Sequence, residues 1–246
     1  MTNTLILIPS RMAATRLPGK PLLKINNLSI ISHVFKRAEE ANIGEVVVAT
    51  ENQEILEDVL KNGGRAILTG SDHKTGTDRI FEAYKELGIK NIDYILNLQG
   101  DEPNINKDDI VTLNNLMINY DADIGTLAAI IKKKKMLTNR NIVKVITQEK
   151  LEKNNFPNAL NFTRDDLSKN YENIYHHIGI YSYKVKALEN FVFLDQTNNE
   201  IKNKLEQLRA LDNKLKMNVA LAKSSPIGVD TEEDYLAIKK IMEYKS

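Results

Sequence analysis

The stretch that decides the fold is the apolar run Thr4-Leu-Ile-Leu-Ile-Pro9, which leads directly into the polar loop Ser10-Arg-Met-Ala-Ala-Thr-Arg-Leu-Pro-Gly-Lys20. A strand that is apolar at successive positions is buried on both faces, which is typical of a parallel sheet covered by helices. In such sheets, ligands bind just beyond the carboxyl ends of the strands. We therefore expect residues 10–20 to belong to a binding site.

The first half of the chain continues in the same alternation. A helix at 29–41, with apolar residues at helical spacing, precedes a second buried strand, Glu45-Val-Val-Val-Ala-Thr50. This order predicts an α/β fold with an open, doubly wound, mostly parallel sheet. Further helices are expected at 54–61, 78–87 and 107–119, and further strands at 65–68, 93–98 and 123–131.

The pattern weakens after residue 131. Lys132–Lys135 is interpreted as solvated surface, and residues 149–173 are polar and rich in Asn. The sequence then predicts a strand at 175–183, a helix at 199–212, a strand at 215–221 and a last helix at 231–244. We expect a nucleotide-binding core, 1–131 with 213–246, and a smaller inserted lobe, 132–212.

Composition excludes several classes of function. The 246 residues include 34 Lys and Arg against 33 Asp and Glu, a net charge of +1 that favours neither nucleic acid nor an anionic membrane as partner. With no Cys, disulfides, thiolate catalysis and Cys-based zinc sites are excluded, and four His leave little for an all-His metal site. No apolar run approaches the roughly 20 residues that span a bilayer. The N-terminus lacks a basic signal-peptide region, so we expect a cytoplasmic protein.

Three cations fall within ten residues of the first loop: Arg11, Arg16 and Lys20. The turn Pro18-Gly19 lets backbone N–H groups approach an anion closely, as the phosphates of a nucleoside triphosphate require. The alternative is an ordinary basic surface loop. The loop is neither G-x-G-x-x-G nor a Walker A motif, which disfavours dinucleotide dehydrogenases and P-loop ATPases.

Two carboxylates are candidate metal ligands. Asp101 follows a buried strand, and its hard oxygen donors suit Mg²⁺, although a simple turn residue is the alternative. Asp230 begins the last helix, and with Glu233 three residues on it has the form of a capping pair.

His177 lies on a strand whose residues alternate in direction. Ile178 and Ile180 are expected to face the core, while His177, Tyr181 and Tyr183 share the opposite face. By itself a strand histidine is more often structural than functional. In the expected helix at 199–212, the apolar stripe is predicted to be Ile201, Leu205, Leu208 and Leu211.

At this point the loop Pro9-Ser-Arg-Met-Ala-Ala-Thr-Arg-Leu-Pro-Gly-Lys-Pro21 resembles the opening of the sugar cytidylyltransferases, most closely the CMP-Kdo synthetases (3-deoxy-manno-octulosonate cytidylyltransferases). The motif Asn97-Leu-Gln-Gly-Asp-Glu-Pro103 supports it, and the two together are specific. Further similar segments, in the family's order, are Ser71-Asp-His-Lys-Thr-Gly-Thr-Asp-Arg79, Asn141-Ile-Val-Lys-Val145, Phe162-Thr-Arg164, His177-Ile-Gly-Ile-Tyr181, Leu205-Glu-Gln-Leu-Arg209 and Gly228-Val-Asp-Thr231.

The resemblance implies an enzyme that joins CTP to a 3-deoxy 2-keto sugar acid, Kdo, for lipopolysaccharide biosynthesis, with a homodimer formed through the inserted lobe. It implies Mg²⁺ as the cofactor, held by Asp101 and Asp230, and a catalytic group of Lys20, Arg16 and these two aspartates. The CTP-binding residues implied are Pro9, Arg11, Arg16, Lys20, Ser71, Gly76 and Gln99. Those implied for the sugar acid are Gln99, Arg164, His177, Tyr181, Glu206 and Gln207.

Each of these sites has a plainer interpretation. Ser71–Arg79 could serve only to cap the helix that Gly76 opens, and His73 is interpreted as a loop residue rather than a metal ligand. Arg164 could be a solvated surface arginine. Helical periodicity alone does not place Glu206 and Gln207 in one site.

The sequence departs from the family pattern in the sugar lobe. After Phe162-Thr-Arg164 the family usually continues with small apolar residues and Pro, whereas Asp165-Asp-Leu-Ser168 stands here. Where the family usually has Ser/Thr-Pro-Leu-Glu, this chain has Thr197-Asn-Asn-Glu200. These departures leave open a related acid, such as an amino-Kdo or a nonulosonate. A catalytically silent nucleotide-binding paralogue is the alternative of another class, and the joint presence of Lys20, Asp101 and Asp230 counts against it.

Overall fold

The computed structural model describes residues 2–13, 16–168 and 172–244. The chain forms two compact units, the first made of residues 1–110 and 226–246 and the second of residues 111–225. Ala14 and Thr15, inside the predicted nucleotide loop, lie outside the described residues.

The first unit is built on a parallel sheet with β1 (Thr4–Ser10) inside it. Strand β1 pairs in parallel with β4 (Gly44–Thr50) on one side and with β6 (Tyr94–Asn97) on the other, and β5 (Ala66–Leu68) pairs with β4. Residues 5–8 of β1 have no exposed surface, which confirms the prediction of a strand buried on both faces. The predicted α/β class is likewise confirmed.

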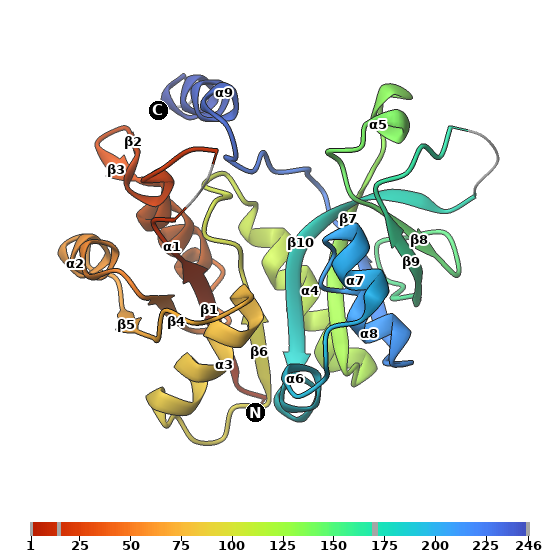
Figure 1. Ribbon diagram of the computed structural model, residues 1–246, viewed down its shortest axis with the longest axis horizontal. Coiled ribbons are helices and arrows are strands. Elements are labelled where there is room, and N and C mark those ends of the chain that lie inside the picture. The colour runs from red at the N-terminus through yellow and green to blue at the C-terminus, as the bar shows by residue number, and fades with distance from the viewer. Residues whose placement is uncertain (1, 14–15, 169–171, 245–246) are drawn as a thin grey trace. The chain divides into compact units, whose positions relative to one another are not determined.

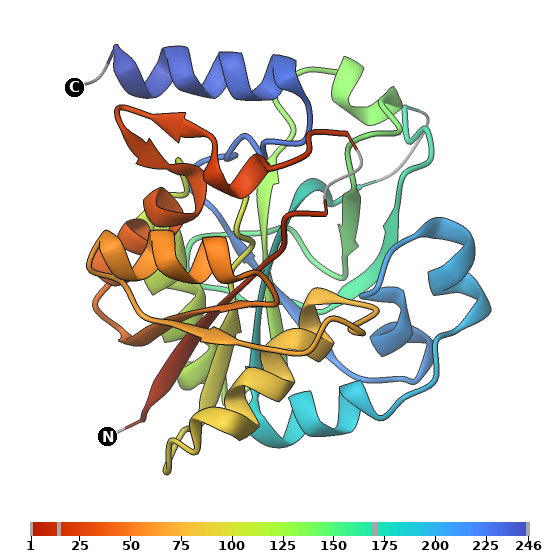
Figure 2. The same cartoon turned by 60° about the vertical axis from the view of Figure 1, so that its left-hand side comes forward.

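The order β6-β1-β4-β5 contains a reversal of direction. The chain moves outward from β1 to β4 and β5, then returns across the sheet to place β6 beside β1. Because such crossovers are right-handed, the outward helix α1 (Ile30–Glu40) and the returning helix α3 (Gly76–Leu87) cover opposite faces (Figures 1 and 2). The carboxyl ends of β1 and β6 therefore form the topological switch point at which ligands bind in this fold class.

The remaining elements of the first unit bring its N-terminal and C-terminal segments together. The N-terminal segments and the C-terminal helix share a core in which Ile25, Ile30, Val229 and Ile238 are fully buried. The remaining elements are the 3₁₀ helix η1 (Lys20–Leu22), the hairpin β2 (Lys24–Ile25) and β3 (Leu28–Ser29), α2 (Gln53–Lys61) and α9 (Glu232–Glu243). Helix α4 (Lys107–Tyr120) runs across the boundary between the units.

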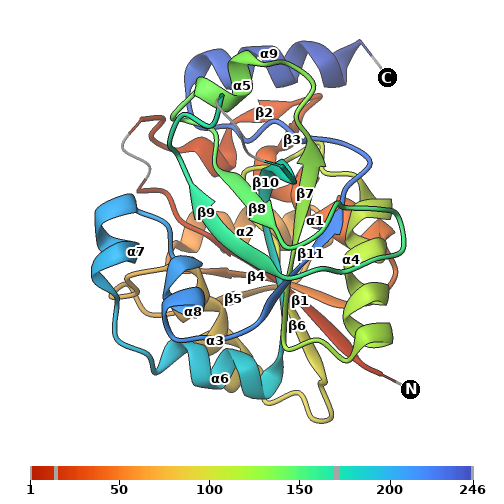
Figure 3. The same cartoon turned by 90° about the vertical axis from the view of Figure 1, so that its right-hand side faces the viewer.

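The second unit is mainly antiparallel (Figure 3). Strand β7 (Ile124–Ile130) pairs in parallel with β11 (Met217–Leu221) and antiparallel with β10 (Ile174–Lys184). Strand β10 also pairs with β8 (Lys144–Thr147), which pairs with β9 (Ala159–Thr163). The helices of this unit are α5 (Lys135–Thr138), α6 (Val185–Val192), α7 (Asn198–Asn203) and α8 (Leu208–Asp212).

Three expectations for this half were wrong in detail. Strand β9 lies in the polar segment 149–173, and β8 was not predicted either, because both are short strands in polar surroundings. The single helix expected at 199–212 is two helices, broken at Lys204, whose φ of 53° is left-handed. Its predicted stripe therefore fails at Ile201, which is exposed. Lys132–Lys135 are exposed, as expected, and Lys135 also begins α5.

The division of the chain also differs from the expected boundaries at 131/132 and 212/213. Strands β7 and β11, assigned to the core, belong to the second unit because both are paired within its sheet. Among the described residues, no helix combines the length and apolar character needed to cross a membrane.

Candidate active site

A cavity of about 330 Å³ lies in the first unit at the switch point between β1 and β6. It is lined by the polar loop after β1, the residues after β6, the start of α3 and the residue before the N-cap of α9. The predicted site residues that line it are Pro9, Arg11, Arg16, Lys20, Gly76, Gln99, Asp101 and Asp230. Of the residues predicted to bind CTP, Ser71 alone does not line the cavity, and its Oγ donates to Asp72.

The turn that presents Lys20 depends on Gly19. Its φ of +70° is left-handed, a conformation that costs glycine little, and it places the residue as the cap of η1. The N–H groups of Gly19 and Lys20 donate to the carbonyls of Met12 and Leu17 at 3.4 and 3.2 Å. These bonds fix the backbone from which the Lys20 side chain reaches the cavity.

A second glycine brings the strand ends together. A Cβ added to Gly100 would lie 2.9 Å from the carbonyl oxygen of Pro9, closer than real Cβ atoms come to backbone atoms. The close approach therefore requires glycine at this position. It places Gln99 and Asp101 beside the end of β1, where the cationic loop begins.

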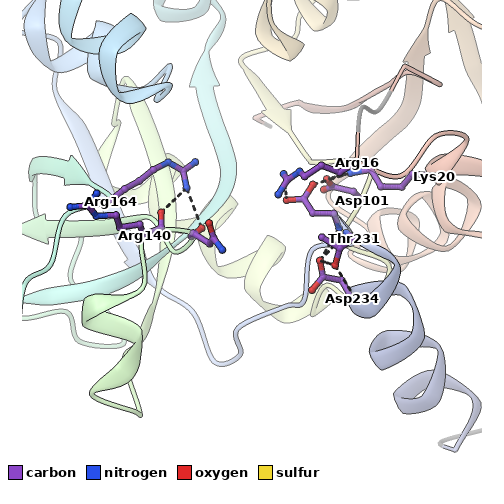
Figure 4. A network of polar contacts seen from close by, with 9 residues as sticks. Arg16, Lys20, Asp101, Arg140, Arg164, Thr231 and Asp234 are labelled. Carbon is purple, nitrogen blue, oxygen red and sulfur yellow. Dashed lines mark hydrogen bonds and ion pairs between the residues drawn. The ribbon is translucent and has the colours of Figure 1, made fainter.

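Lys20 links the two candidate metal ligands (Figure 4). Its ammonium Nζ donates to Asp101 Oδ2 at 2.8 Å and to Asp230 Oδ1 at 3.3 Å. The second oxygen of Asp230 pairs with Arg16 at 2.9 Å. The Lys20 side chain is 14% exposed, so this ion pair is shielded more than that of Arg16, which is 64% exposed.

The cap of α9 leaves Asp230 available for this role. Thr231 is the N-cap, and its side chain accepts from the N–H of Asp234, whose carboxylate in turn accepts from the Thr231 N–H (Figure 4). The capping pair expected between Asp230 and Glu233 is therefore wrong by one residue. Because the capping box uses Thr231 and Asp234, the Asp230 carboxylate is directed to Arg16 and Lys20 instead.

The donor set fits the predicted Mg²⁺. Asp101 and Asp230 offer carboxylate oxygens around one ammonium nitrogen, at the wall of a cavity that also holds cations suited to phosphates. Mg²⁺ is commonly held by one or two carboxylates together with substrate phosphates and water. Within the described residues no group of three or more His, Cys, Asp or Glu could hold a metal ion.

Side chains of α3 hydrogen-bond to the loop at 69–76. The buried guanidinium of Arg79 donates to Thr69 and to the Gly70 carbonyl and pairs with Glu51, while Glu82 accepts from the Gly70 N–H and contacts His73. Helix capping is present too, through Thr75 and Asp78. As expected, His73 is a loop residue.

Sequence reasoning missed Glu102, directly after Asp101. Burial, with the charge of Asp101 as the second cause, raises the pKa of Glu102 to about 8. Its Oε2 is buried with no hydrogen-bond partner among the described residues. Near neutral pH this carboxyl is therefore largely protonated, and the negative charge at this turn rests on Asp101. A second acid directly after the first was the only signal in the sequence.

In the second unit, His177 is buried inside a row of rings. Its ring lies 5.0 Å from that of Phe162 and 5.5 Å from that of Tyr181, and Tyr181 lies 6.1 Å from Tyr183. The predicted sharing of one face by His177, Tyr181 and Tyr183 is thus confirmed, across a bulge between Ile178 and Tyr181. That face is nevertheless largely buried, like the face of Ile178 and Ile180.

The environment fixes the protonation of His177. Burial, followed by the charges of His176 and Arg164, lowers its pKa to about 3, so the ring is neutral at physiological pH. Thr126 Oγ1 donates to the carbonyl of Ile180 at 2.7 Å and lies 3.0 Å from His177 Nε2. Since the single hydroxyl proton is used on Ile180, the network assigns the ring proton to Nε2 and leaves Nδ1 as an acceptor.

Tyr181 and Glu206 lie within electrostatic range of one another. Burial raises the pKa of Tyr181, and the charges of Tyr183 and Glu206 raise it further, so its hydroxyl keeps its proton. Gln207 is buried at the start of α8. Beside it, Arg209 forms a buried bidentate pair with Glu200 at 2.8 and 2.6 Å and lies 3.9 Å from Glu206.

Both the side chain and the backbone of Arg164 are held in place, the backbone by a buried lysine that the sequence did not single out. The Arg164 guanidinium donates to the carbonyls of Arg140 and Asn141 at 3.4 and 3.1 Å (Figure 4). The fully buried Lys144 donates to three carbonyls, those of Asn139, Arg164 and Asp165, at 3.0, 3.2 and 2.9 Å. Arg164 is therefore an anchored residue rather than a freely solvated one.

Comparison with known proteins agrees with this geometry. A family model described as cytidylyltransferase matches residues 5–218. A protein from Nitrobacter hamburgensis named 3-deoxy-manno-octulosonate cytidylyltransferase is 44% identical over 98% of this chain and 93% of its own length. A protein of the same name from Rhodopseudomonas palustris strain BisB5 is 45% identical over 94% of each chain. The solved structure of a CMP:2-keto-3-deoxy-manno-octonic acid synthetase complexed with CTP is 32% identical, with a TM-score of 0.90 over all of both chains.

Proposed function

This chain belongs to the cytidylyltransferase family, and from that premise we propose that it joins CTP to 3-deoxy-manno-octulosonate (Kdo), forming CMP-Kdo and pyrophosphate. The similarity to proteins of that name covers nearly the whole chain, the segments at 164–209 included. The product would serve lipopolysaccharide biosynthesis.

One observation carries the proposal. In a single cavity at the switch point, Arg11, Arg16 and Lys20 converge with Asp101 and Asp230, although residues 11 and 230 are at opposite ends of the sequence. A triphosphate brings several negative charges, which the three cations would balance. Two carboxylates beside them would be unfavourable for a phosphate unless a divalent cation lay between.

In the proposed reaction the protein forms no covalent bond with either substrate. The anomeric 2-hydroxyl of Kdo attacks the α-phosphorus of CTP in line and loses its proton, an O–P bond forms, and the bond to the β-phosphate bridging oxygen breaks to release pyrophosphate. Arg11, Arg16 and Lys20 orient the triphosphate and balance charge on its oxygens, so catalysis rests on positioning and electrostatics. No protein nucleophile takes part.

Asp101 and Asp230 are the residues that would hold Mg²⁺. When bound there, the ion supplies positive charge beside the phosphates and favours the ionised form of the attacking hydroxyl. The largely protonated Glu102 next to Asp101 adds little negative charge to this turn.

The proposed contacts for the sugar acid in the second unit remain Arg164, His177, Tyr181, Glu206 and Gln207. Gln99, which was predicted for both substrates, lines the cavity of the first unit. His177 Nδ1 can accept from a sugar hydroxyl, and the protonated Tyr181 can donate to one. Arg164, with a backbone held by Lys144, suits a carboxylate. A related acid, an amino-Kdo or a nonulosonate, is the second candidate, because Asp165 and Asp166 follow Arg164 directly.

The test is release of pyrophosphate on mixing the protein with CTP, Mg²⁺ and Kdo. We expect turnover with Kdo and a lower kcat/KM with an amino-Kdo or a nonulosonate in direct competition. UTP in place of CTP serves as the nucleotide control. Turnover with another acid only would reassign the substrate, and no pyrophosphate with any acid would reject the enzymatic function. Dimer formation and a cytoplasmic location stay predictions, and light scattering of the purified chain tests the first.

A further inference from the structure

The ammonium of Lys20 lies between the two residues that would hold a metal ion. It contacts one oxygen of each predicted metal ligand, at 2.8 Å for Asp101 and 3.3 Å for Asp230. With a side chain only 14% exposed, Lys20 is enclosed by the groups it neutralises. The protein thus carries its own cation between the two carboxylates.

The backbone segments that carry the two carboxylates are joined by bonds that do not involve Lys20. The Val229 N–H donates to the Asp101 carbonyl at 2.9 Å, which joins the two backbone segments next to the ligand residues. The Asp230 N–H donates to Asp234, inside the capping box of α9. On the other side, Gly100 seats Asp101 against the end of β1. The backbone therefore holds the two carboxylate-bearing residues near each other, and neighbouring like charges favour a cation between them.

We propose that Lys20 is an internal counter-cation that keeps divalent metal from binding at Asp101 and Asp230 until a nucleotide triphosphate draws the ammonium away. For a metal ion to bind alone, Lys20 would have to leave both carboxylates, and its ammonium would then lack an anionic partner in a shielded position. A triphosphate would supply that partner. Lys20 would then move from carboxylate to phosphate and leave Asp101 and Asp230 free to hold the metal.

This exchange deepens the proposed function, on which it rests, by setting the order of assembly. Binding of metal and binding of nucleotide are therefore coupled. The nucleotide pairs with the Lys20 ammonium that metal binding would leave unpaired, and the metal separates the two carboxylates from the phosphates. Arg16 opposes metal binding less than Lys20 does, since it contacts only Asp230 and its side chain is 64% exposed.

The experiment measures binding of Mn²⁺ alone, by the electron paramagnetic resonance signal of the free ion, with no nucleotide or sugar present. Mn²⁺ prefers the same oxygen ligands as Mg²⁺. We expect Lys20→Met to bind Mn²⁺ about tenfold tighter than the wild type, because the substitution removes the cation that pairs with both carboxylates. Mg²⁺ alone should then raise the Tm of Lys20→Met and leave that of the wild type nearly unchanged.

The matched control is Lys24→Met, which removes an exposed lysine four residues away and should bind Mn²⁺ like the wild type. Adding Asp230→Asn to Lys20→Met should abolish the gain. Equal or weaker Mn²⁺ binding by Lys20→Met, with a folded protein by circular dichroism, would overturn the proposal, as would a gain that survives Asp230→Asn. Because no turnover is measured, this outcome is independent of whether pyrophosphate is released from CTP and Kdo.

Discussion

At the scale of single residues, the cavity brings together side chains whose charges are unfavourable alone and favourable as a set. Asp101 and Asp230 are 129 positions apart in the sequence, yet both lie within 3.3 Å of Lys20 Nζ. Their value to the reaction should therefore be joint rather than separate.

We expect Asp101→Asn and Asp230→Asn each to lower kcat by about 10³-fold or more, because each removes a charge from the metal site. The double variant should be little worse than the worse single one, since residues that act as a unit are not additive. Steady-state kinetics across a Mg²⁺ titration measures this. Near-normal turnover in either single variant would remove that aspartate from the metal site.

The depressed pKa of His177 makes a prediction about stability. In the unfolded chain this ring takes up a proton below a pKa of about 6.5, whereas the folded protein holds it neutral down to about 3. The contribution is therefore fully present above pH 6.5 and is lost as the pH falls, by about 2 kcal/mol at pH 5. Urea unfolding of wild type and His177→Gln between pH 5 and 7.5 should show a shallower pH dependence in the variant. Parallel curves would mean that His177 is not held neutral.

At the scale of elements, each part of the site is positioned by the end of a strand or helix. Helix α9 is the clearest case, since its N-terminus places Asp230 while Thr231 and Asp234 cap it. A shift of the cap by one residue decides whether Asp230 serves the helix or the cavity.

Thr231→Ala should lower the free energy of unfolding by about 1 kcal/mol, as loss of an N-cap usually does. Glu233→Ala, at the position that the sequence suggested as the capping partner, should change it by less than about 0.5 kcal/mol because that side chain is exposed. Urea denaturation compares the two. Equal losses would restore the pairing of Asp230 with Glu233.

Lys144 ties the end of β9 to the loop before β8, so its loss should affect both stability and the sugar acid. Lys144→Met leaves three carbonyls without their donor and should cost about 3 kcal/mol of unfolding free energy. It should also raise the KM for Kdo more than that for CTP, because Arg164 shares the anchored loop. Exposed Lys150→Met is the control. An equal rise in both KM values would leave Lys144 with a purely structural role.

At the scale of the whole molecule, the sequence predicted most reliably what depends on local periodicity. The buried strand β1, helix α1 and the loop from Pro9 to Lys20 all follow from patterns within about a dozen residues. Strands β8 and β9 could not be found in this way, because their burial arises from pairing with one another and with β10. The left-handed Lys204 and the protonation of Glu102 likewise depend on contacts that no local pattern encodes.

The Val229 N–H bond to the Asp101 carbonyl has a consequence for synthesis of the protein. The first unit needs both ends of the chain, whereas the second is one continuous segment. During synthesis Lys20 and Asp101 precede the second unit, whereas Asp230 and the hydrophobic residues Val229 and Ile238 follow it. A nascent chain that ends before residue 229 therefore carries the triphosphate loop without its second carboxylate. We expect such a fragment to be unable to turn over CTP.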